Sequence, residues 1–132
     1  MNKLFTFCFF ILSTSILSNA PYVYIIEPKD GSEVINPVRV VFGLSGMGVA
    51  PAGVDKPGTG HHHLLIDLKQ LPDLTKSIPT DKNHLHFGGG QTETILNLEP
   101  GNNDLQLVLG NWFHMPHANP LISKKITIKV KK

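Results

Sequence analysis

The chain has 132 residues, and its 12 basic and 10 acidic side chains give a formal net charge of +2 at pH 7. A chain of this length supports one domain of ordinary size rather than two, and so small a charge excludes the strongly basic surface typical of nucleic-acid binding. The only cysteine is Cys8, so no internal disulfide can form and stability depends on the core alone.

The first twenty residues have the pattern of a secretory signal peptide. A short positive start ending at Lys3 is followed by the apolar run 4–17, and small residues close the segment at Ala20. This pattern predicts export to the periplasm or out of the cell with residues 1–20 removed, because the run is too short and wrongly flanked to be a membrane span. Pro21 is a poor first residue after cleavage, so the cleavage position stays open, and a retained N-terminal anchor is the alternative.

The mature region, residues 21–132, is predicted to be a single domain built from short strands. Signals for helices are nearly absent, and runs of β-branched residues alternate with Gly, Pro and Asn. Six strands are predicted, at residues 22–27, 37–43, 61–68, 91–98, 104–109 and 122–130. We therefore predict an all-β fold, a single immunoglobulin-like or fibronectin-like antiparallel sandwich of about six or seven strands.

Seven histidines fall in three groups that adjoin the long connections of this predicted sandwich. The connections are residues 44–60, 69–90 and 110–121, and the groups are His61-His62-His63, His84-Leu85-His86 and His114-Met115-Pro116-His117. Loops of such length inside a compact domain are usually functional or mobile. We therefore expect histidine-bearing loops at one pole of the sandwich.

Two connections decide whether the three groups meet. The turn at 99–103 predicts that strands 91–98 and 104–109 are hairpin neighbours, which places the second and third histidine groups at the same end. The stretch 69–83 is long enough to run back along the sandwich, since an extended chain covers about 3.3 Å per residue against a strand length of about 20 Å. We expect this return crossing, which brings the first group to the same pole. The alternative is that the stretch caps the far end.

The alternation of side chains along a strand separates the histidines further. His62 shares a face with Leu64, Ile66 and Leu68, so we expect it to pack in the core, while His61 and His63 point together to the other side. By the same period His84 and His86 share one face. The run Gly88-Gly89-Gly90 lacks the residues of a phosphate loop, and we expect it to be a bend that lets the backbone pass close to the histidines.

These residues predict a metal site made of imidazole with an optional thioether. Such ligands suit copper, with zinc as the alternative, and a methionine ligand would favour cuprous copper. The candidate ligands are His61, His63, His84, His86, His114, His117 and Met115. We predict no catalytic residue. The expected partners are a metal ion and a cell-envelope protein, with no nucleic acid and no stable membrane span after cleavage.

Two alternatives stay open at this point. In the first, the histidines bind backbone carbonyls and stiffen the loops of an interaction domain that contacts a protein or cell-envelope partner without any metal. In the second, the chain is a metal-dependent enzyme, which would need an open coordination position and a base such as Glu93. Convergence of imidazole nitrogens from separate groups would favour the metal site over the first alternative.

Four strings of the sequence resemble a bacterial family known as domain of unknown function 4399. They are Gly46 to Gly53, Gly60 to Asp67, His84 to Glu93, and Leu105 to Asn111 with His114 to His117 after it. The resemblance extends over about residues 43–130. It implies a small exported domain of this type and by itself supplies no activity.

Overall fold

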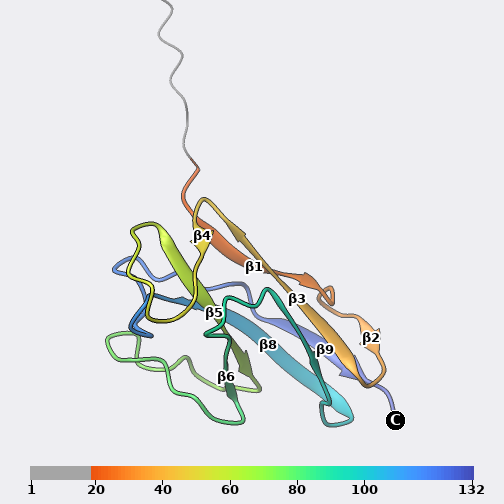
Figure 1. The fold of residues 1–132 in the computed structure, drawn as a ribbon. Coiled ribbons are helices and arrows are strands. Elements are labelled where there is room, and N and C mark those ends of the chain that lie inside the picture. The colour runs from red at the N-terminus through yellow and green to blue at the C-terminus, as the bar shows by residue number, and fades with distance from the viewer. Residues whose placement is uncertain (1–18) are drawn as a thin grey trace, which may run out of the picture.

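The computed structural model describes residues 19–132, so the predicted signal peptide lies outside the described residues except for its last two positions. Among the residues described there is no helix, and the strands follow one another as β1 to β9, most of them labelled in Figure 1. They are β1 (Tyr22–Glu27), β2 (Glu33–Val34), β3 (Val38–Ser45), β4 (Gly48–Val49), β5 (Thr59–Ile66), β6 (His84–His86), β7 (Glu93–Leu96), β8 (Gly101–Gly110) and β9 (Ile126–Val130). Each of the six predicted strands overlaps one of these, while β2, β4 and β6 were not predicted.

Two sheets form the sandwich. The smaller sheet has the order β1-β3-β7, and the larger has the order β2-β9-β8-β5-β4 with β6 also paired to β5. Most pairs are antiparallel, and the short pairs β2–β9 and β4–β5 are parallel. The predicted all-β sandwich is therefore confirmed. Strand β5 lies inside the larger sheet, with β8 on one side and β4 and β6 on the other.

The predicted hairpin between the strands at 91–98 and 104–109 is wrong. Strand β7 pairs with β3 in the smaller sheet, whereas β8 pairs with β5 and β9 in the larger one. The side chain of Asn36 explains the difference, because it donates to the carbonyl oxygen of Leu98 at 2.7 Å and accepts from the Leu98 amide at 3.0 Å. The Leu98 backbone is held there and its side chain is buried, so the chain crosses at this point from the smaller sheet to the larger one instead of turning back within one sheet.

The main core lies between the two sheets and includes one histidine. Val40 and Phe42 of β3 and Leu64 of β5 are among its buried side chains, and Leu105, Leu107 and Leu109 of β8 join them. His62 is fully buried on this side, with its ring centroid 5.2 Å from that of Phe42. The prediction that His62 packs in the core is confirmed. Burial lowers the pKa of His62 because the charged ring loses its water.

A smaller apolar cluster covers the outer face of the larger sheet. Leu65 of β5 and Val108 of β8 pack there against Ile78 from the connection between β5 and β6. In that connection, the amide of Ile78 donates to the carbonyl of His114 at 2.8 Å. Further along, the carbonyl of Asn83 accepts from the Ile66 amide at 2.9 Å. Residues 69–83 therefore run back to the histidine pole at Ile78, as expected, but then go to the far end of β5 at Asn83. The return is made by β6, which runs antiparallel beside β5.

Candidate metal centre

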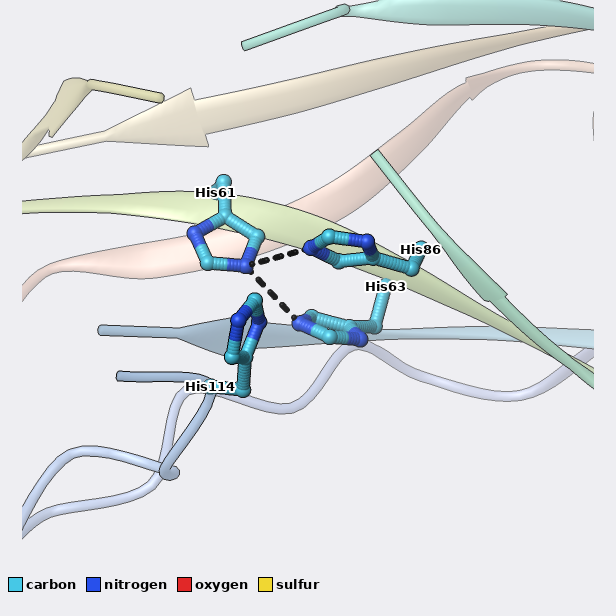
Figure 2. A group of neighbouring side chains, drawn as sticks. All are labelled: His61, His63, His86 and His114. Carbon is cyan, nitrogen blue, oxygen red and sulfur yellow. Dashed lines mark hydrogen bonds between the residues drawn. The ribbon is translucent and has the colours of Figure 1, made fainter. Parts of the chain in front are cut away.

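Four imidazole rings from three parts of the chain converge on the outer face of the larger sheet (Figure 2). His61 and His63 come from β5, His86 from β6 and His114 from the loop after β8. One nitrogen from each ring lies within 4.8 Å of the corresponding nitrogen of every other ring. All three histidine groups of the sequence therefore contribute to one cluster.

The sheet itself fixes three of the rings. His61 and His63 are two residues apart on β5 and so point to the same face, and the pairing of β5 with β6 sets His86 directly opposite His63. The Nε2 atom of His61 lies 3.1 Å from Nε2 of His63 and 3.2 Å from Nε2 of His86. Nitrogens bound to one tetrahedral ion at about 2.0–2.1 Å would lie about 3.3 Å apart. Both distances from Nε2 of His61 are thus close to the separation of metal ligands.

Hydrogen bonding between the rings does not satisfy these nitrogens. Each Nε2 carries either one hydrogen or one lone pair, so Nε2 of His61 cannot make a full hydrogen bond to both of its neighbours. The Nδ1 atoms of His61 and His63 are buried and have no hydrogen-bond partner among the described residues. A cation placed between the rings would use all three Nε2 lone pairs together.

Burial keeps three rings of the cluster neutral. The pKa of His61 is lowered to about 4 and that of His63 to about 3, in both cases chiefly by burial and then by the neighbouring imidazoles. Burial lowers the pKa of His86 as well, and the neighbouring His114 adds to this effect. Neutral imidazole is the form that binds metal. His61, His63 and His86 are therefore held in their ligand form at neutral pH.

Two glycines make room for the rings. A Cβ atom added to Gly110, which pairs with His61 across β5 and β8, would lie only 2.8 Å from Nε2 of His63. A Cβ atom on Gly88 would lie 2.6 Å from Nε2 of His86. The expectation that the glycine run lets the backbone pass close to the histidines is confirmed for Gly88. The role of Gly110 was not predicted, because the sequence does not reveal which side chain lies across the sheet.

The fourth ring is held by a network of loop hydrogen bonds. Asn111 accepts with its Oδ1 from the amides of Phe113 and Met115 at 2.9 and 3.0 Å. His114 has a φ of 61°, in the left-handed region that non-glycine residues rarely adopt, and its carbonyl accepts from the Ile78 amide at 2.8 Å. Asn111 is a positioning residue that our sequence reasoning missed, although Asn after Gly is a turn signal that could have identified it.

Three of the predicted ligands lie outside this group of four. His84 shares a face with His86 but lies further along β6, where its Nδ1 is 2.8 Å from a carboxylate oxygen of Asp81. Nε2 of His117 is buried without a hydrogen-bond partner among the described residues, and the Sδ atom of Met115 accepts from the Ser77 hydroxyl at 3.5 Å. None of these three residues belongs to the group of four.

The base that a metal-dependent enzyme would need is in the other sheet. Glu93 lies in the smaller sheet, where it pairs with Arg39. Trp112 and Phe113, which precede His114, are 42% and 61% exposed, with ring centroids 5.2 Å apart. Within residues 19–132, the structure contains no helix of the length and apolarity needed to cross a membrane.

Comparison with known proteins gives one match. Neither the curated proteins nor the solved structures include a match to this chain. A family model described as "Domain of unknown function (DUF4399)" matches residues 40–131, which is well over half of the chain and includes all four clustered histidines. The chain therefore belongs to the DUF4399 family.

Proposed function

We propose that this protein is an exported metal-binding module that binds or handles copper, with zinc as the alternative ion. The observation that carries the proposal is the convergence of Nε2 of His61 with Nε2 of His63 at 3.1 Å and with Nε2 of His86 at 3.2 Å, with His114 as the fourth ring. Imidazole is the commonest protein ligand for such ions.

The arrangement of the rings favours a metal site over a purely structural role. Histidines that only stiffen loops would direct their nitrogens at backbone carbonyls, as the side chain of Asn83 does when it donates to the Ile66 carbonyl. The Nε2 atoms of His61, His63 and His86 face one another instead. Burying two fully enclosed polar rings costs free energy, and metal binding would offset it.

The ligand set favours copper. The group of four contains only imidazoles, without a carboxylate or a thiolate. Hard ions such as Ca²⁺ and Mg²⁺ prefer oxygen ligands, and among the divalent ions that accept nitrogen the affinity for copper is above that for zinc.

The proposal of export rests on the sequence of residues 1–20, whose charged start, apolar run and small residues are those of a secretory signal. When the full chain is expressed in a Gram-negative host, we expect the protein in the periplasmic fraction with a mass that lacks these residues. A full-length mass in the membrane fraction would instead indicate a retained anchor.

A thermal melt tests metal binding directly. An ion that binds only the folded chain at 100 times its Kd stabilises it by about 2.7 kcal/mol, which for a domain of this size raises the Tm by on the order of 10 °C. We expect this shift with Cu²⁺ and a smaller one with Zn²⁺, and we expect a chelator to reverse both. No shift at saturating concentrations of either ion would contradict the proposal.

Two variants of β6 provide a matched pair for this test. His86→Ala removes a clustered ring and should abolish most of the shift, while His84→Ala removes a ring of the same strand that is paired with Asp81 and should preserve it. Circular dichroism of both variants checks that the fold is intact. Equal loss in the two variants would show that the effect is not specific to the four-histidine group.

A second candidate function rests on the exposed Trp112 and Phe113 side chains. Adjacent exposed aromatic rings are typical of surfaces that bind another protein, so the domain could contact a cell-envelope partner without metal. The thermal melt separates the two functions, because this one requires no ion.

A further inference from the structure

Three of the four clustered rings are fixed by the larger sheet. His61 and His63 are fully buried on β5, which is hydrogen-bonded to β8 along one side and to β4 and β6 along the other. His86 is held opposite His63 by the pairing of β6 with β5. Direct nitrogen contacts of 3.1 and 3.2 Å join these three rings. They form a preorganised set of three ligands.

His114 is held by a loop rather than by the sheet. It is half-buried, as His86 is, but it lies outside any strand, and its backbone has the left-handed φ of 61°. Its ring contacts the others by its edge, with centroids 4.7 Å from His86, 5.2 Å from His61 and 6.2 Å from His63. The neighbouring Trp112 and Phe113 are exposed, so the side of the site that His114 covers faces solvent.

On the basis of the proposed metal site, we propose that His114 is an exchangeable ligand. An imidazole group from outside the protein takes its place, while His61, His63 and His86 retain the ion. The bond between the ion and the His114 nitrogen breaks, and a bond to the nitrogen of the incoming imidazole forms. The incoming imidazole donates the lone pair of its unprotonated nitrogen, and the oxidation state of the ion does not change.

This exchange gives the site a route for passing an ion on. A closed set of four ligands fixed by the sheet would hold the ion as a structural site does, whereas three fixed ligands and one replaceable position resemble the open geometry of sites that exchange ligands. An acceptor that presents a histidine could bind the ion before the domain lets go of it. The donor is thus either a histidine side chain of another chain or a free imidazole compound.

The test uses the full protein carrying one equivalent of Cu²⁺, with imidazole labelled with nitrogen-15 as the probe. Electron paramagnetic resonance distinguishes labelled from unlabelled nitrogen ligands. In the wild-type protein we expect excess imidazole to enter the copper signal while the ion still co-elutes with the protein. The fluorescence of Trp112, the only tryptophan of the chain, should change as the loop leaves the ion.

His114→Gly provides the reference state, because glycine accepts the left-handed backbone without strain. We expect this variant to bind one Cu²⁺ and to release the ion to a chelator at least about tenfold faster than the wild type does. Added imidazole should restore the wild-type release rate, with the label in the copper signal. His84→Ala should behave as the wild type does. A peptide with capped ends and one histidine distinguishes the two donors. If the peptide restores the release rate, the position is assigned to a protein side chain. If imidazole alone restores it, the position is assigned to a small molecule.

Two results would overturn the proposal while leaving the metal site intact. One is loss of copper from the wild type whenever imidazole binds, because the ion would then be stripped from all four rings together. The other is a His114→Gly variant that binds no copper, or that gives a copper signal unchanged by the labelled probe. Absence of copper binding by the wild type would instead contradict the proposed function itself.

Discussion

Gly110 has no side chain, and this leaves room for the His63 ring. A methyl group there would lie 2.8 Å from Nε2, so we expect Gly110→Ala to push the ring out of the group of four and to weaken metal binding at least about tenfold. Overpacking of this kind also costs about 1–3 kcal/mol of stability. Isothermal titration with Cu²⁺ and urea denaturation measure the two effects.

Gly48→Ala is the matched control for that substitution. A Cβ atom at Gly48 would meet only ordinary contacts, the nearest at 3.5 Å from Thr59, so both quantities should stay near their wild-type values. Equal metal affinity in the two variants would show that Gly110 does not act through His63.

The buried His61 and His63 make the metal-free protein sensitive to acid. Their pKa values are about 4 and about 3 in the folded state, below the value near 6.5 of an unfolded chain. The unfolded state therefore binds more protons between these values, and folding stability falls as the pH is lowered from about 6.5 toward 3. At pH 5 each ring should cost on the order of 2 kcal/mol relative to pH 7 and above.

Urea denaturation of the metal-free protein at pH 7 and pH 5 measures this effect. Replacement of His63 by the apolar Leu should make the pH dependence shallower, because one proton-binding group is lost from the unfolded state. A free energy of unfolding that is equal at the two pH values would contradict the buried, neutral state of these rings.

At the scale of elements, the loop after β8 depends on the side chain of Asn111. Its Oδ1 atom accepts from two loop amides, so we expect Asn111→Ala to leave both unpaired, to loosen His114 and to lower metal affinity by about 10–100-fold, as loss of a supporting group does in other metal sites. Asn111→Asp keeps the accepting oxygen and should retain most of the affinity. Metal titration of the two variants makes the comparison, and equal affinities would exclude this role.

The elements also show how far local patterns extend. The period of two along β5 predicts correctly that His62 faces the core and that His61 and His63 face away from it, because alternation is a property of any extended strand. The pairing of β7 with β3 rather than with β8 could not be predicted in this way. It depends on the contact between Asn36 and Leu98, which are 62 residues apart.

At the scale of the whole molecule, the site joins segments that the sandwich alone leaves loosely connected. The connection between β5 and β6 and the loop after β8 meet through Ile78 and His114, and a bound ion would add bonds between β5, β6 and that loop. Metal should therefore slow amide hydrogen exchange in residues 67–90 and 110–117 more than in β1 and β3 of the smaller sheet. Hydrogen exchange with and without Cu²⁺ measures the difference, and uniform slowing across both sheets would contradict this coupling.

The sequence by itself determined that the chain is an all-β sandwich, where its longer strands lie, that His61 and His63 share a face, and that it resembles the DUF4399 family. These conclusions depend on local periods, turn residues and matching strings. Only the tertiary structure decided that His86 rather than His84 joins the group, and that His114 is the member from the last loop. The reason is physical: the register of β6 on β5 and the hydrogen bonds from Asn111 and Ile78 are contacts set by the folded chain, and no period along one strand encodes which ring of a pair they bring into the group of four.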